Sequence, residues 1–235
     1  MQAVILAGGM GTRLKSVISD RPKPMALIHG KPFLEYQIRY LKQCGMKNIV
    51  ICAGYLGSMI ESYFGNGEGF GVRLDYSHEQ EPLGTAGAVR NAERLLEEDF
   101  VVLNGDTYYT CDYEALIRFH LNRQSALTIS MVPGKSANDY GSVMLNEECR
   151  ITGFSEKMEN GSGLISTGVY VMNREVLNRI PPREKVSFEN DLIPGLVKEK
   201  AGIFGCLNEE GLFIDIGVPE RYFYFLDYAR RFELI

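Results

Sequence analysis

The spacing of apolar residues predicts alternating strands and helices in the first half of the chain. A strand that helices cover on both faces is apolar throughout, whereas helices show apolar positions three to four residues apart. These rules predict strands at Ala3–Ala7, Asn48–Ala53, Val72–Ser77 and Asp99–Leu103, with helices at Pro32–Cys44, Leu56–Phe64 and Gly84–Leu96. Strands that alternate with helices at this spacing indicate a doubly wound, mostly parallel sheet.

The second half of the chain has a different pattern. A helix is predicted at Tyr113–Gln124, followed by strands at Ala126–Val132, Ser142–Leu145, Ile151–Glu156 and Leu164–Met172. Because these strands follow one another without long helices, they predict a mixed, partly antiparallel extension of the sheet. An aromatic-rich helix at Tyr222–Arg231 packs within the fold or against a partner subunit. We find no repeat or linker, so residues 1–235 are expected to form a single domain.

Composition narrows the class of protein. A net charge of −5 argues against a nucleic-acid surface, and no apolar run approaches the roughly 20 residues that span a bilayer. The N-terminus also lacks the basic segment of a signal peptide. The five cysteines contain no CxxC pair and are read as reduced thiols: Cys44, Cys52, Cys111, Cys149 and Cys206. We therefore expect a cytoplasmic protein with no membrane or nucleic-acid partner.

The segment after the first predicted strand contains the strongest candidate chemistry. Gly8, Gly9 and Gly11 can turn backbone amides toward one anion, and Arg13 and Lys23 add positive charge. Prolines on both sides of Lys23 stiffen its backbone. A single pair of these glycines would predict only a tight turn beside solvated basic residues. The three glycines together with Arg13 and Lys23 instead favour a binding site for a triphosphate. The spacing matches neither a Walker A loop nor a GxGxxG fingerprint.

Two carboxylates follow apolar segments far apart in the sequence. Asp106 ends the segment LNGD, and Asp215 lies in FIDIG. In open α/β sheets, ligands bind beyond the carboxyl ends of the strands, so the two acids could converge on Mg²⁺, which prefers oxygen ligands. The alternative for Asp106 is a turn residue that caps the helix near Tyr113.

The opening GGxGTRL…PKP resembles the sugar-1-phosphate nucleotidyltransferase family, and segments in family order run from Gly8 to Asp215. The resemblance implies an α/β fold with a Rossmann-like, mixed but mostly parallel sheet flanked by helices, the nucleotide-diphospho-sugar transferase fold. It implies that a nucleoside triphosphate and a sugar 1-phosphate react to give a nucleotide sugar and pyrophosphate. Arg13, Lys23 and Asp106 would be catalytic, and Asp106 and Asp215 would hold Mg²⁺. Lys15, Ser16 and Val17 depart from the family pattern.

The same resemblance implies two sets of binding residues. Nucleotide-binding residues would be Leu6, Ala7, Gly8, Gly9, Gly11, Thr12, Arg13, Lys23, Glu81, Pro82, Gly84 and Thr85. Sugar-phosphate-binding residues would be Tyr140, Gly141, Glu156, Lys157, Thr167 and Gly168. Glu189 resembles a late acidic segment of the family, and a helix-capping role is an equal alternative.

The segment EPLGTAGA, residues 81–88, is similar to that of the guanylyl-transferring members and favours GTP. We expect its turn to leave backbone amides and a helix N-terminus exposed to the base. The nearby Gln80 leaves uridylyl transfer open, and thymidylyl and cytidylyl transfer remain further alternatives. The compact chain most resembles members that use D-glycero-α-D-manno-heptose 1-phosphate, with mannose 1-phosphate as the alternative and a homo-oligomer possible. A metal-dependent glycosyltransferase is the rival of another class, although such enzymes usually carry Asp-x-Asp where this chain has Gly105-Asp106-Thr107.

Overall fold

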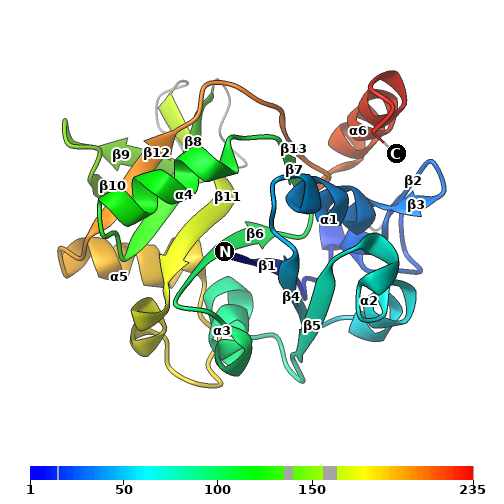
Figure 1. The fold of residues 1–235 in the computed structure, drawn as a ribbon, viewed down its shortest axis with the longest axis horizontal. Helices are drawn as coiled ribbons and strands as arrows, with labels where there is room; N and C mark the ends of the chain where they lie inside the picture. The colour runs from blue at the N-terminus through cyan, green and yellow to red at the C-terminus, as the bar shows by residue number, and fades with distance from the viewer. Residues whose placement is uncertain (15, 135–139, 156–162, 235) are drawn as a thin grey trace.

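A nine-stranded mixed sheet forms the centre of the molecule in the computed structural model, which describes residues 1–14, 16–134, 140–155 and 163–234 (Figure 1). Seven strands lie in the order β10 (Ile151–Ser155), β9 (Ser142–Leu145), β11 (Gly163–Asn173), β6 (Asp99–Asn104), β1 (Gln2–Ala7), β4 (Asn48–Ala53) and β5 (Arg73–His78). Two more strands extend it, because β8 (Leu127–Gly134) pairs with β11 and β12 (Ile203–Leu207) pairs with β8.

The four strands predicted in the first half form the parallel part of the sheet. β1 lies between β4 and β6, and β5 pairs with β4, all in parallel. Side chains alternate along β1, so that Val4 enters one hydrophobic core while Ala3 and Ile5 enter the other. Both faces are therefore buried, which explains the apolar runs, and the carboxyl ends of all four strands lie at one edge.

The second half adds antiparallel pairing, as the sequence predicts. β11 runs antiparallel to β6 and β8, and β9 and β10 pair with each other in the same way. β12 pairs parallel to β8 and was missed, because its run IFGCL is short and contains a glycine. The predicted strand Ile151–Glu156 is present to Ser155, and Glu156 lies outside the described residues.

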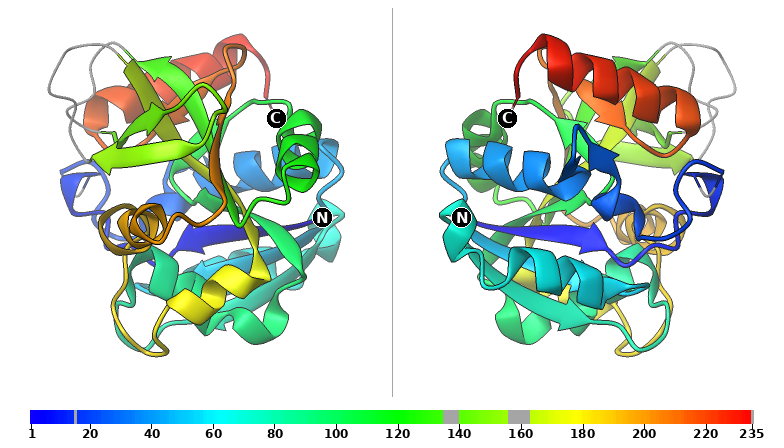
Figure 2. Two further views of the ribbon diagram at one scale, coloured as in Figure 1. Left: turned by 90° about the vertical axis from the view of Figure 1, so that its left-hand side faces the viewer. Right: turned by 90° about the vertical axis from the view of Figure 1, so that its right-hand side faces the viewer.

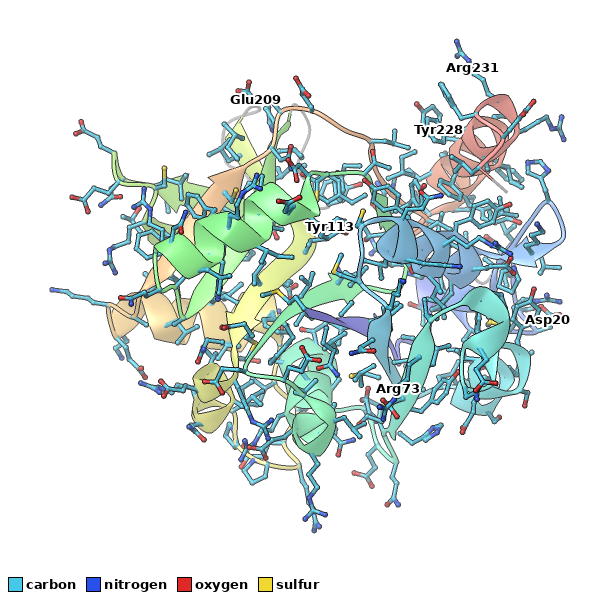
Figure 3. The ribbon with its side chains drawn as sticks, viewed as in Figure 1. Asp20, Arg73, Tyr113, Glu209, Tyr228 and Arg231 are labelled. Carbon is cyan, nitrogen blue, oxygen red and sulfur yellow. The ribbon has the colours of Figure 1, made fainter. Side chains whose placement is uncertain are left out.

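Helices cover both faces of the sheet. α1 (Phe33–Gln43), α2 (Gly57–Phe64) and α4 (Tyr113–Asn122) bury side chains in one core, and α3 (Gly84–Asn91) and α5 (Ile193–Lys198) in the other. Tyr113, labelled in Figure 3, joins α4 to α1, since its ring centroid lies 6.1 Å from that of Tyr40. The short helical segments are η1 (Thr12–Leu14), η2 (Lys23–Met25), η3 (Glu68–Phe70), η4 (Glu93–Leu95), η5 (Arg174–Arg179) and the π-helix η6 (Phe188–Leu192).

The predicted helix Gly84–Leu96 is too long. α3 ends at Asn91, and residues 93–95 form the separate 3₁₀ turn η4. The Gln2 side chain donates to the Leu95 carbonyl at 2.9 Å and accepts from the Glu97 amide at 3.0 Å. These bonds tie the end of the segment to the start of β1, in place of a further helical turn.

The C-terminal helix α6 (Pro219–Arg231) rests on a third core, away from α3 (Figure 2). Phe225 lies edge-on to Phe33 and Tyr36, at centroid distances of 4.9 and 5.7 Å. Two small ribbons also belong to the fold: β7 (Thr107–Tyr109) with β13 (Phe213–Asp215), and β2 (Leu27–Ile28) with β3 (Lys31–Pro32). Within the described ranges, no helix is both long and apolar enough to span a bilayer.

Candidate active site

The glycine loop lies where the chain leaves β1 and meets the loop after β4. A Cβ atom on Gly54 would lie 2.9 Å from the Cα of Gly8, and the Tyr55 amide donates to the Gly8 carbonyl at 3.3 Å. The two backbones approach so closely that a side chain at Gly54 would collide. Gly11 adopts a φ of 59°, which glycine accepts without strain, and the chain then enters η1.

The first cavity opens along the carboxyl ends of β6, β1, β4 and β5 and has a volume of about 600 Å³. Its walls come from the glycine loop, the loop after β4 and the segment after β5. It is lined by Leu6, Ala7, Gly8, Gly9, Met10, Gly11, Lys23, Pro24, Gly54, Tyr55, Glu79, Gln80, Glu81, Pro82, Gly84, Thr85, Ala88, Asn104, Asp106 and Lys185. A cavity at this edge is where open α/β sheets bind ligands.

Lys23 and Asp106 meet at one end of this cavity. The Lys23 Nζ lies 2.7 Å from Asp106 Oδ2, with side chains 13% and 26% exposed. The Lys23 side chain packs against the glycine loop, since a Cβ atom on Gly11 would lie 3.2 Å from the Lys23 Cβ. Asp106 follows β6 through Gly105, whose amide donates to the Leu6 carbonyl at 2.9 Å. An ammonium and a carboxylate are therefore fixed beside the glycine loop.

A second cavity of about 350 Å³ shares two residues, Asn104 and Asp106, with the first. Its lining is rich in hydroxyl, carboxylate and guanidinium groups. It consists of Arg13, Asn104, Asp106, Thr107, Tyr140, Gly141, Ser166, Thr167, Gly168, Tyr170, Glu189, Phe213, Asp215 and Arg221. Such groups suit a polyhydroxylated anion, and a ligand there would be next to one in the first cavity.

Asp215 reaches the second cavity through the β7–β13 ribbon. Asp215 pairs with Thr107, and the Ile216 amide donates to the Asp106 carbonyl at 2.9 Å, so the two acidic segments are ladder neighbours. Asp215 Oδ1 accepts from the Gly217 amide at 2.8 Å and lies 3.0 Å from a guanidinium nitrogen of Arg221. Asp215 Oδ2 accepts from the Tyr140 hydroxyl. Both aspartates therefore line one cavity, and their joint binding of Mg²⁺ stays a prediction.

The donor set at these aspartates suits a magnesium ion that completes its coordination with ligand oxygens. In the described part of the chain, no group of three or more His, Cys, Asp or Glu side chains could enclose a metal. Two carboxylates at one cavity nevertheless match Mg²⁺, which is usually held by one or two carboxylates together with phosphates and water. Lys23 and Arg221 balance the two negative charges.

The segment after β5 differs from its prediction. The amides of Ala86 and Gly87 both donate to the Val186 carbonyl, at 2.9 and 3.1 Å, and are not left for a ligand as expected. A Cβ atom on Gly84 would lie 2.5 Å from that carbonyl oxygen, and Gly84 has a φ of 72°. The glycines in EPLGTAGA thus allow residues 184–186 to cross closely over the start of α3, an arrangement that the local sequence does not reveal.

The other predicted residues divide between the cavities. All predicted nucleotide-binding residues line the first cavity except Thr12, which is in neither lining, and Arg13, which lines the second. Tyr140, Gly141, Thr167 and Gly168 line the second cavity as a group. Glu156 and Lys157 lie outside the described residues.

Glu189 faces the second cavity from η6, and the capping residue of that segment is Ser187. The Ser187 side chain accepts from the amides of Glu189 and Asn190, as an N-cap does. The Glu189 carboxylate instead accepts from the hydroxyls of Tyr170 and Ser187, both at 2.9 Å. The capping alternative for Glu189 is therefore wrong.

Three charged or polar side chains of the first cavity escaped sequence reasoning. Glu79 lies two residues after the predicted strand ending at Ser77, and this position was the available signal. Asn104 lies in the LNGD segment, but only Asp106 of that segment was predicted to have a role. Lys185 had no sequence signal, because it reaches the cavity only where its segment crosses α3.

The chain is similar over nearly its whole length to known proteins. It is 41% identical to the D-glycero-alpha-D-manno-heptose 1-phosphate guanylyltransferase of Campylobacter jejuni, covering 96% of this chain and 99% of the relative. It is 40% identical to the enzyme of the same name from Aneurinibacillus thermoaerophilus, covering 94% and 95%. A mannose-1-phosphate guanylyltransferase from Mycobacterium tuberculosis is 33% identical and matches 94% of this chain but 62% of its own.

Structural and family comparisons agree with this similarity. The crystal structure of HddC from Yersinia pseudotuberculosis superimposes with a TM-score of 0.85 at 37% identity, covering 97% of this chain and 98% of that one. A second HddC structure, complexed with GMP-PN, gives a TM-score of 0.84. The family model described as nucleotidyl transferase matches residues 2–229. Because this model spans almost the whole chain and two relatives are at least 40% identical, the chain belongs to the nucleotidyl transferase family.

Proposed function

We propose that this protein transfers a guanylyl group from GTP to D-glycero-α-D-manno-heptose 1-phosphate, giving GDP-heptose and pyrophosphate. The observation that carries the proposal is the junction of the two cavities at Asn104 and Asp106. One cavity has the glycine loop and Lys23, which suit a triphosphate, and the other has hydroxyl and charged groups that suit a sugar phosphate. The names of the two relatives at 40 and 41% identity supply the two substrates.

The reaction joins two anions and needs no protein nucleophile. A phosphate oxygen of the sugar 1-phosphate attacks the α-phosphorus of GTP, a new P–O bond forms, and the bond from the α-phosphorus to the β-phosphate oxygen breaks. The electron pair leaves with pyrophosphate. Charge repulsion and positioning dominate the barrier, so fixed cations at the junction provide most of the catalysis.

We assign Lys23 and Arg13 to different phosphate groups of the two substrates. Lys23 lies in the first cavity beside the glycine loop and balances charge on the α-phosphate. Arg13 was expected among the nucleotide-binding residues, but it lines the second cavity. We therefore propose that Arg13 and Arg221 attract the incoming sugar phosphate, because both guanidinium groups belong to that lining.

We further propose that Asp106 and Asp215 hold Mg²⁺ during the reaction. When bound, the ion would screen the repulsion between phosphate oxygens. The acids are suited to this role because they line the same cavity, with Asp215 at the end of β13 and Asp106 immediately before its partner strand β7. If Asp106 engages the ion, the Lys23 ammonium becomes available to phosphate.

Mannose 1-phosphate is the second candidate substrate. The Mycobacterium tuberculosis relative named for it is 33% identical, and the match covers 62% of that relative. The two relatives named for heptose are 41% and 40% identical, and this higher identity favours heptose. We also propose that residues 1–235 act as one cytoplasmic domain, with homo-oligomerisation left as a prediction.

A substrate panel tests the proposal directly. The protein is incubated with Mg²⁺, each of GTP, ATP, UTP, CTP and dTTP, and either heptose 1-phosphate or mannose 1-phosphate, and pyrophosphate release is measured. We expect the highest kcat/KM for GTP with heptose 1-phosphate. Faster turnover with mannose 1-phosphate would replace the sugar assignment. Release of a nucleoside diphosphate from a ready-made nucleotide sugar would indicate a glycosyltransferase.

A further inference from the structure

Protein donors surround both oxygens of the Asp215 carboxylate, whose side chain is 10% exposed. Oδ1 accepts from the Gly217 amide at 2.8 Å and from the Arg221 Nε at 3.2 Å, and the Arg221 Nη2 lies 3.0 Å from it. Oδ2 accepts from the Tyr140 hydroxyl. A carboxylate offers about four lone-pair sites, and these donors occupy them. A metal ion can therefore bind Asp215 only where one of the donors moves away.

Arg221 is the donor that a divalent cation would displace. The Gly217 amide belongs to the backbone two residues from Asp215, and the Tyr140 hydroxyl is neutral. The Arg221 guanidinium and Mg²⁺ are both cations, so they compete for the same negative charge and repel each other at contact distance. The Arg221 side chain is 24% exposed and extends from α6, which allows the guanidinium to move while the helix stays in place.

The second cavity offers the Arg221 guanidinium another partner. A Cβ atom on Gly217 would lie 3.5 Å from the Arg221 Nη2 and 3.7 Å from the Arg13 Nη2, so the two guanidinium groups flank one point. A single phosphate group can bridge two nitrogens at this spacing, and guanidinium forks match phosphate oxygens. Among the described residues, the Arg13 guanidinium has no ion pair or hydrogen bond. Both arginines therefore suit an anion bound in this cavity.

We propose that Arg221 couples the binding of Mg²⁺ to the binding of the sugar phosphate. Without the ion, Arg221 holds Asp215; with the ion on this carboxylate, Arg221 turns to the phosphate and clamps it together with Arg13. The coupling is reciprocal, because a phosphate that draws Arg221 away from Asp215 raises the affinity of Asp215 for the ion. The inference rests on the proposed function for the ion at Asp215 and deepens it by linking the two ligands.

The variant Arg221→Gln tests the competition for Asp215. We measure the dissociation constant of Mn²⁺ by electron paramagnetic resonance in the absence of nucleotide, since Mn²⁺ shares the preference of Mg²⁺ for oxygen ligands. We expect Arg221→Gln to bind Mn²⁺ about 10-fold more tightly than the wild type, because a charge-assisted hydrogen bond no longer competes with the ion.

The same variant should bind the sugar phosphate more weakly. Calorimetric titration with heptose 1-phosphate at saturating Mn²⁺ should show a dissociation constant about 10-fold higher than that of the wild type, because one guanidinium–phosphate pair is lost. The opposite signs of the two effects identify the coupling, since loss of a purely structural arginine would weaken both ligands. Arg231→Gln, at an exposed position of the same helix, is the matched control and should change neither constant.

Unchanged or weaker Mn²⁺ binding in Arg221→Gln would overturn the inference, as would unchanged binding of the sugar phosphate. Should the variant fail to fold, the wild type decides. Coupling is contradicted there if Mn²⁺ and heptose 1-phosphate leave each other's dissociation constants unchanged, and supported if each tightens the other.

The proposed function can fail separately from this coupling. If neither the wild type nor Arg221→Gln binds Mn²⁺, the metal assignment itself is wrong. A wild type that binds mannose 1-phosphate in place of heptose 1-phosphate contradicts only the sugar assignment, and the same comparison of variants is then made with mannose 1-phosphate.

Discussion

Asp106 has contacts with both halves of the site, since it lines both cavities and pairs with Lys23. Its neighbour Asp215 is more enclosed, with Gly217, Arg221 and Tyr140 around its carboxylate. A partly exposed ion pair contributes at most about 1 kcal/mol to stability. The Lys23–Asp106 pair therefore matters more for charge placement at the junction than for folding.

The variant Asp106→Asn tests whether Asp106 matters more for catalysis than for stability. We expect kcat to fall by about 100-fold or more, because one of the two carboxylates proposed to hold Mg²⁺ is lost. The melting temperature should fall by no more than about 4 °C. Asp227→Asn, an exposed residue on α6, is the control and should change neither quantity. Nearly normal turnover in Asp106→Asn would contradict the proposed role.

His120 illustrates a polar residue that serves folding. The residue is 1% exposed, with Nδ1 2.9 Å from Thr128 Oγ1 and Nε2 3.4 Å from Asp99 Oδ1. Burial lowers the pKa of His120 below 6.5, although Asp99 opposes the shift. It lines neither of the two cavities, so its polar contacts belong to the packing of α4 on the sheet.

The pH dependence of stability follows from that shift. The unfolded chain protonates His120 at a higher pH than the folded chain, so protonation favours unfolding. We expect the free energy of unfolding to decrease as pH falls below 6.5, and to stop decreasing through this group below the folded pKa. Urea titrations of the wild type and His120→Gln across this window measure the effect. The same slope in both proteins would contradict it.

At the scale of elements, the irregularity in β11 shapes the second cavity. The pairing of β11 with β8 shifts register between Ser166 and Tyr170, and Gly168 in this stretch has a φ of 70°. A Cβ atom on Gly168 would collide with Asn104 Nδ2. The bulge thus lets β11 approach the end of β6, where both cavities meet.

Gly168→Ala should damage both fold and activity. The positive φ costs an alanine about 1–2 kcal/mol, and the clash displaces Asn104. We expect a lower melting temperature together with an increased KM for the sugar phosphate. Gly69→Ala is the control, since a Cβ atom there meets nothing within 4 Å. Normal KM values for both substrates in Gly168→Ala would show that the bulge does not shape the site.

At the scale of the whole molecule, the third core connects the C-terminal helix to the active site. This core contains Phe225 of α6, Leu14 beside Arg13, and Ile214 and Ile216 on either side of Asp215. The opposite side of α6 faces outward, where Arg231 projects in Figure 3. Packing of a distant helix therefore supports the positions of Arg13 and Asp215.

Phe225→Ala tests this support. Removing a fully buried phenylalanine costs about 3–5 kcal/mol, which lowers the melting temperature by about 10 °C. We also expect kcat to decrease at temperatures where the variant remains folded, because Leu14 and Ile216 lose their packing partner. Phe223→Ala on the same helix is the control, since Phe223 is 53% exposed. A kcat equal to that of the wild type would show that packing in this core does not affect catalysis.

The sequence by itself determined the features that depend on local geometry. Buried parallel strands require continuous apolar runs, so β1, β4 and β6 could be predicted, and a strand–glycine–basic pattern located one wall of the first cavity. The Pro-Lys-Pro context predicted a fixed Lys23 for the same reason, since proline restricts its own and the preceding residue.

Only the tertiary structure decided which distant groups meet. Pairing of β13 with β7 brings Asp215 beside Asp106, and crossing of residues 184–186 over α3 occupies two amides expected to be free. The same packing places Arg13 in the second cavity and Glu79 beneath the glycine loop. These outcomes depend on how separate elements share one sheet edge, and side-chain spacing along a single segment carries no information about its neighbours in space.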